Sequence, residues 1–153
     1  MKRFLCLITV LSLLLCLAGC GGIEDTNGPD DFSLVTITDE DICGGRFSSS
    51  AVMSSTFTSG NKTTLKIKKF SGVKDSPDAR VKANGETLIW RTAITVTAGN
   101  FRACIVRDNE EIVGEFPIDG TGEVKIENAA GTYYLRIAGE SAAFSLVYTL
   151  EKE

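Results

Sequence analysis

The feature that most constrains the fold is a two-residue alternation of apolar and polar side chains. Leu65 and Ile67, for example, alternate with the lysines at positions 66 and 68. Successive side chains of a β-strand point to opposite faces of a sheet, whereas a helix needs apolar residues three or four positions apart. The pattern therefore predicts strands that are buried on one face and exposed on the other.

The same alternation recurs along the rest of the chain between segments rich in Gly, Asn and Asp. The predicted strands are 64–70, 87–97, 101–107, 111–116, 124–126, 133–137 and 144–150, preceded by a Ser- and Thr-rich strand within 46–58. Asp108-Asn109-Glu110 predicts a hairpin turn, and Trp90 is expected to be the largest core side chain. Residues 75–86 contain Pro77 and Asn84-Gly85, so we expect a loop or a short irregular segment there.

Short strands with turn signals at regular intervals favour one architecture. We expect an all-β domain over residues 32–153, folded as a single antiparallel β-sandwich of jelly-roll or immunoglobulin-like type with about seven or eight strands. A chain of 153 residues is long enough for one ordinary core. The segment from Gly131 to Ile137, followed by a glycine turn and a last apolar strand, resembles the closing strands of exported bacterial sandwich modules.

The start of the chain differs from the rest. Lys2 and Arg3 precede an almost wholly apolar run from Phe4 to Leu17. A transmembrane helix needs about 20 apolar residues, so this run is too short to span a membrane and is typical of a signal peptide. It ends in Leu17-Ala18-Gly19-Cys20.

Those last four residues resemble the lipobox of bacterial lipoproteins. The resemblance implies removal of residues 1–19, S-diacylglycerol and N-acyl groups on Cys20, and anchoring to a bacterial cell membrane on the side facing away from the cytoplasm. If the source has an outer membrane, that membrane is the alternative location. The alternative is an ordinary secretory signal that releases an unlipidated product. Residues 20–31 are rich in Gly and acidic groups, which predicts a tether of about 18 Å root-mean-square length.

Two cysteines, Cys43 and Cys104, remain after processing and lipidation. An exported compartment permits a disulfide between them, which would close a loop of about 60 residues and stabilise the domain by about 4 kcal/mol. The alternative is two separate buried thiols, because Cys104 lies in an apolar strand.

Composition excludes several functions. The chain contains no histidine, the usual general base and the commonest metal ligand. Its net charge of −4 becomes more negative when Lys2 and Arg3 are removed, which disfavours nucleic acid as a partner. Ser59-Gly-Asn-Lys62 and Ser71-Gly-Val-Lys74 match the spacing of a Ser-Lys nucleophile, but neither lies on a predicted helix, so both are interpreted as turns. We therefore predict no enzyme activity and no cofactor.

Two acidic clusters, Asp39-Glu40-Asp41 and Asp108-Asn109-Glu110-Glu111, contain oxygen ligands that suit calcium. Turns favour Asp and Asn for backbone reasons alone, so solvated turns are the preferred interpretation and no metal site is predicted.

Two further groups of residues, one cationic and one aromatic, are candidates for a binding surface. The cations are Lys62, Lys66, Lys68, Lys69 and Lys74, which form a stripe suited to anionic lipid or wall polymer, or else the solvated face of a strand. The aromatic residues are Trp90, Tyr133 and Tyr134, which would bind sugar rings if any of them faced outward. Of the three, alternation places only Tyr134 opposite the core face.

The function predicted from these observations is a membrane-anchored binding, adhesion or envelope-structural module, whose partner is a protein or polysaccharide of the envelope. One alternative is a histidine-free hydrolase of wall or exported polymer that uses paired carboxylates such as Asp108 and Glu111. Another is an accessory subunit of an envelope membrane complex, which an exposed apolar patch would favour.

Overall fold

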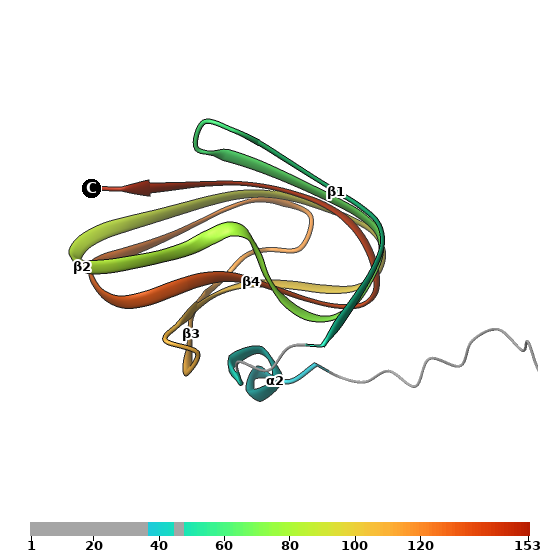
Figure 1. Cartoon of the computed structure of the whole chain (residues 1–153), viewed down its shortest axis with the longest axis horizontal. Helices are drawn as coiled ribbons and strands as arrows, with labels where there is room; N and C mark the ends of the chain where they lie inside the picture. Colours follow the sequence, from blue (N-terminus) through green and yellow to red (C-terminus); the bar gives the residue numbers. More distant parts are fainter. Residues whose placement is uncertain (1–36, 45–47) are drawn as a thin grey trace, which may run out of the picture. The chain divides into compact units, whose positions relative to one another are not determined.

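The computed structural model describes residues 37–44 and 48–153, and strands make up most of them (Figure 1). The elements are α2 (Asp39–Cys43), β1 (Ser49–Ser59), β2 (Lys62–Arg107), β3 (Glu111–Glu115) and β4 (Gly120–Lys152). All strand pairings are antiparallel, which confirms the predicted all-β, antiparallel class. The predicted signal peptide, Cys20 and the tether lie outside the described residues. Among the described residues, no helix has the length and apolarity needed to cross a membrane.

β2 and β4 are long strands that bend back on themselves, so different parts of each pair with different partners (Figure 1). In a first ladder, residues 49–59 of β1 pair with 62–72 of β2, and 62–70 of β2 pair with 142–149 of β4. Residues 88–98 of β2 lie on the other side of β4, paired with 143–152, and also pair with 120–126. β1 is therefore an edge strand of this ladder.

A second ladder uses the remaining parts of the same strands. Residues 72–86 of β2 pair with 129–139 of β4, and residues 100–107 of β2 pair with 133–140 of β4. β3 completes the ladder by pairing with residues 104–107 of β2, which confirms the predicted hairpin at 108–110.

One apolar cluster receives side chains from both ladders. Leu65, Trp90 and Leu146 come from the first ladder, and Tyr133 and Leu135 come from the second. Each of these five side chains is almost completely buried, and Trp90 is the largest among them, as predicted. The alternation of the sequence thus places one face of each ladder in a shared core.

A second, smaller cluster lies beneath the helix α2. Ile42 of α2 is buried there with Val73, Cys104, Val106 and Ala138 of the strands. The sequence showed no helical repeat because α2 has only one turn. Thr38 begins it with a capping box: the Thr38 hydroxyl accepts a hydrogen bond from the Asp41 amide, and the Asp41 carboxylate accepts one from the Thr38 amide.

Of the two alternatives predicted for 75–86, the loop was wrong, because these residues continue β2, whereas the irregular segment agrees with register shifts between Asp75 and Arg80 and between Asn84 and Glu86. The turn-forming residues are accommodated by a register shift between Asp75 and Arg80, where Asp78 has a φ of 55°. An irregularity of this kind tolerates Pro77, whose missing amide hydrogen cannot join a regular ladder. The strand predicted within 46–58 is confirmed by β1.

Candidate functional site

An open groove of about 900 Å³ with a mixed polar and apolar lining lies over the first ladder. Its lining comes from three strands, β1, β2 and β4, and comprises Met53, Ser54, Ser55, Lys66, Ile67, Lys68, Thr95, Thr97, Ala143, Phe144 and Ser145. Because Leu65 and Leu146 point into the core, the side chains at positions 66 and 145 face away from it. The groove therefore lies on the solvent face of the ladder.

The register of the strands explains why hydroxyl groups surround a lysine in this groove. Ser55 is paired with Lys66, Lys66 with Ser145, and Ser145 with Thr95. Paired residues of neighbouring strands share a face and lie about 5 Å apart across the sheet. These four residues, which are far apart in the sequence, consequently form one row across the groove, here called the Lys66 row.

An apolar rim borders the Lys66 row on the β1 side. Met53 is 67% exposed and Phe57 is 69% exposed, and every residue of β1 is exposed. Phe57 is paired with Thr64, two residues along β2 from Lys66, so it lies on the same face as the Lys66 row. The sequence contained this signal, because Phe57 alternates in step with Ser55, but the faces could not be assigned without the register.

The structure divides the lysine stripe. Lys66 and Lys68 line the groove, whereas Lys62, Lys69 and Lys74 are not among its lining residues. Strand alternation explains the division in part, since Lys66 and Lys68 are two residues apart and share a face.

Trp90 and Tyr133 are buried in the core, as the alternation predicted, so neither can contribute to an aromatic platform. Tyr134 is partly exposed, and the guanidinium carbons of Arg80 and Arg136 lie 5.7 Å and 5.3 Å from its ring centroid. Its ring is therefore engaged by cations.

The two acidic clusters, which are about 70 positions apart in the sequence, meet in the structure. A pocket of about 450 Å³ is lined by Asp39, Glu40, Cys43, Gly44, Asn109, Glu110, Glu111 and Ile112. Within residues 37–44 and 48–153, no group of three or more acidic or cysteine side chains is arranged to hold a metal ion. Asp41 caps α2 instead, and its hydrogen bonds with Thr38 lower the pKa of its carboxyl group.

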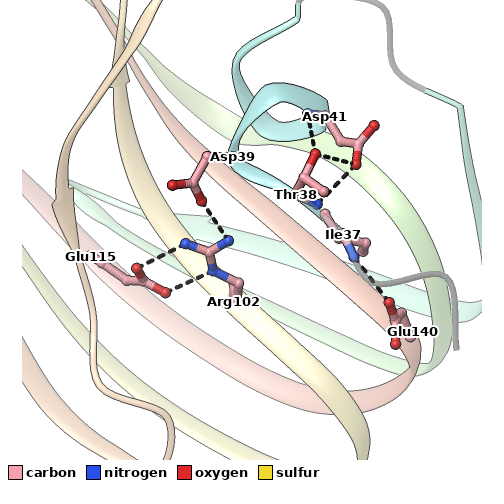
Figure 2. A network of polar contacts seen from close by, with 7 residues as sticks. All are labelled: Ile37, Thr38, Asp39, Asp41, Arg102, Glu115 and Glu140. Atoms are coloured by element: carbon pink, nitrogen blue, oxygen red, sulfur yellow. Dashed lines mark hydrogen bonds and ion pairs between the residues drawn. The ribbon is translucent and has the colours of Figure 1, made fainter.

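Figure 2 shows how polar contacts fasten the start of α2 to the strands. Arg102 of β2 donates a hydrogen bond to Asp39 at 2.8 Å and one to each carboxylate oxygen of Glu115 of β3, at 2.9 Å and 3.0 Å. These carboxylates raise the pKa of the Arg102 guanidinium. Glu140 accepts a hydrogen bond from the Ile37 amide at 3.1 Å. Asp39, Glu115 and Glu140 therefore help to hold the start of α2 against the strands.

Arg136 holds the other end of α2, and the sequence analysis missed it. It is 1% exposed and donates to the Ile42 carbonyl at 2.5 Å, to Asn109 Oδ1 at 2.6 Å and to Asp75 Oδ1 at 2.9 Å. Its position between Leu135 and Ile137 suggested the solvent face of a strand. That face is covered by α2, which no alternation of the strand could reveal.

Cys43 and Cys104 belong to the same cluster beneath α2 and are both free thiols in this structure. Burial raises the pKa of Cys104 to about 12, and it raises the pKa of Cys43 as well. The two residues therefore approach each other in the fold although they are far apart in the sequence. Their pairing in an exported protein stays a prediction, which counting thiols in unreduced, denatured protein would test.

The two carboxylates considered for hydrolysis, Asp108 and Glu111, each form a contact with a neighbouring part of the fold. Asp108 accepts a hydrogen bond from the Thr132 amide at 2.7 Å, which closes its turn against β4. Glu111 forms an ion pair with Arg107. Ser59 and Lys62 face each other across the turn between β1 and β2, as the turn interpretation of that motif predicted.

No protein-family model matches this sequence, and no curated protein is similar to it. Among solved structures, the enzymatically active domain of bacteriophage CBA120 tailspike protein 4 is 8% identical, with a TM-score of 0.41 over 71% of this chain and 19% of that chain. The chain thus matches about a fifth of the tailspike's length.

In two other solved structures, the match spans about nine-tenths of the other chain's length. PliG from Aeromonas hydrophila, a periplasmic inhibitor of g-type lysozyme, is 18% identical, with a TM-score of 0.37 over 62% of this chain and 91% of that one. The C-terminal CBM6 of LamC from Zobellia galactanivorans is 15% identical, with a TM-score of 0.38 over 67% and 90%. At these TM-scores none of the three assigns a family or an activity.

Proposed function

We propose that this chain is a lipid-anchored binding module that holds a β-sandwich outside a bacterial cytoplasm and takes its ligand in the groove over the first ladder. The lipobox-like sequence Leu17-Ala18-Gly19-Cys20 supports the anchor. Acyl chains on Cys20 would hold the protein at the membrane, and residues 21–31 would separate the domain from the lipid surface.

The pairing pattern supports the sandwich. The two ladders contribute to one core, and β2 and β4 each pass from one ladder to the other. Register shifts occur at the passages, between Phe70 and Gly72 and between Ala98 and Asn100. Strands that change sheets at such bends are typical of jelly rolls, so we favour that form over the immunoglobulin-like one.

The groove is the observation that carries the binding function. Concave sites with a few convergent polar groups are the usual places for ligands. The Lys66 row supplies hydroxyl and ammonium groups, and the exposed ring of Phe57 offers an apolar contact beside them.

A groove-filling substitution tests the function. Ser145→Trp should obstruct the Lys66 row, whereas Thr121→Trp places the same side chain on the first ladder outside the groove. Full-length lipidated protein in detergent is sedimented with envelope polymer prepared from the producing cells and freed of protein and lipid. Wild type and T121W should cosediment and S145W should not. Equal behaviour of all three proteins would refute the groove as the binding site.

The anchor is tested separately. Mass spectrometry of the mature N-terminus should find Cys20 as the first residue, carrying diacylglycerol and an N-acyl chain. Cys20→Ala should leave residues 1–19 uncleaved and the protein unacylated. A mature end that lacks Cys20, or an unmodified Cys20, would contradict the anchor.

A further inference from the structure

The charge of the groove is opposite to that of the chain. The protein has a net charge of −4, yet the described residues that line the groove include Lys66 and Lys68 and no carboxylate. Ion pairs elsewhere engage Arg91, Arg102 and Lys125 with nearby acids. Within residues 37–44 and 48–153, neither groove lysine belongs to such a pair. The positive charge in the groove is thus left for a ligand.

The spacing of the two lysines suits a ligand with repeated charges. Residues two apart on a strand lie about 7 Å from each other along it, and their side chains point to the same face. Lys66 and Lys68 therefore present two ammonium groups along the direction of β2. A single small anion would be held by one of them, whereas a polymer with an anionic group on successive units can engage both.

The remaining groups of the groove suit a sugar. Ser55, Ser145 and Thr95 supply hydroxyl groups that can both donate to and accept from a polyol. Phe57 is not a lining residue of the groove, but it is exposed on the same face, two residues along β1 from Ser55, where its ring can pack against the apolar face of a sugar ring. Thr97 is already committed, since its hydroxyl donates to the Ala143 carbonyl at 3.2 Å.

We infer that the groove binds an acidic polysaccharide, with anionic groups on Lys66 and Lys68, sugar hydroxyls on the Lys66 row and a sugar ring against Phe57. This inference rests on the proposed binding function and names its ligand. A flat membrane surface is a poorer fit, because headgroups would have to enter a groove on the face of the ladder. An extended peptide is also a poorer fit, because it gains its main-chain hydrogen bonds at a sheet edge and the groove lies over the paired face.

Three dextrans test the ligand class, because they share one backbone and differ in charge. Full-length protein in neutral detergent is titrated with dextran sulfate, carboxymethyl dextran and unmodified dextran of equal length. Both charged forms should bind at least about tenfold more tightly than dextran at low salt, and the difference should shrink as salt is added. Equal binding of charged and neutral dextran, or no binding of any, would overturn the inference.

Two charge-matched double variants locate the charged contact. Lys66→Gln with Lys68→Gln should weaken binding of the charged dextrans about tenfold, because two partly exposed ion pairs are lost. Lys62→Gln with Lys74→Gln removes the same charge outside the groove and should change binding less than twofold. Equal losses in the two variants would show unspecific attraction and overturn the inference.

Two further outcomes separate this inference from its alternatives. If soluble glycerol phosphate competes as effectively as the charged dextrans, the groove recognises an isolated headgroup-like phosphate and the polysaccharide assignment is wrong. If S145W abolishes cosedimentation with envelope polymer while the lysine variants bind it normally, the binding function stands and only the acidic ligand class is refuted.

Discussion

Arg136 gives the sharpest test of how the domain is held together. Its guanidinium is buried and donates to the Ile42 carbonyl, to Asn109 and to Asp75. Arg136→Met keeps an unbranched side chain but removes every donor. The variant should therefore release the end of α2 from the strands while leaving the shared core of the two ladders unchanged.

The magnitude follows from the exposure of each partner. The bond to the Ile42 carbonyl is buried, and a buried acceptor that loses a charged donor costs about 1–3 kcal/mol. The side chain of Asp75 is 41% exposed, so that ion pair adds only about 0.5–1 kcal/mol. Part of this loss is offset, because methionine carries no charge whose burial costs free energy. We expect the free energy of unfolding to fall by about 2–3 kcal/mol.

Urea unfolding followed by the fluorescence of Trp90, the chain's single tryptophan, measures this change. With a slope of about 1.5 kcal/mol per molar, the midpoint should fall by about 1.5–2 M. Arg102→Met is the control, because Arg102 also contacts α2 but its ion pairs are more exposed and should cost less than about 1 kcal/mol. Equal midpoints for the two variants would refute the reasoning.

Three further predictions concern a glycine, a thiol and the groove rim. Gly72→Ala should destabilise the protein more than Gly85→Ala in urea unfolding. Both glycines have positive φ, but a Cβ at Gly72 would lie 2.0 Å from the Ser48 carbonyl oxygen, whereas a Cβ at Gly85 would have no atom within 4 Å. In reduced protein, burial raises the pKa of Cys104 from 9.0 to about 12, so the folded protein keeps this proton at a pH where the unfolded chain loses it. The free energy of unfolding should therefore fall from pH 8 to pH 10 by about 1 kcal/mol more in wild type than in Cys104→Val. Parallel pH profiles of the two proteins would contradict this. Phe57→Ser should change the free energy of unfolding by less than about 0.5 kcal/mol, since Phe57 is exposed, but should weaken binding of carboxymethyl dextran. Unchanged binding would remove Phe57 from the site.

Strand alternation predicted much of the fold because one face of each strand is buried. It identified the inward residues Leu65, Trp90, Tyr133 and Leu146 from local spacing alone. Alternation did not show that the irregular segment over 75–86 is part of β2, where a register shift accommodates the turn-forming residues. It also missed α2, because a helix of a single turn has no repeat. In both cases tertiary pairing overrode a local preference.

By itself, the sequence determined the all-β class, the core faces of the strands, the hairpin at 108–110 and the lipobox-like start, since each depends on neighbouring residues. Only the tertiary structure decided which strands pair. That pairing placed Ser55, Lys66, Thr95 and Ser145 in one row, and it brought α2 over Arg136 and Cys104. The physical reason is that side-chain alternation fixes which face a residue occupies, whereas the partner opposite it depends on register between distant segments.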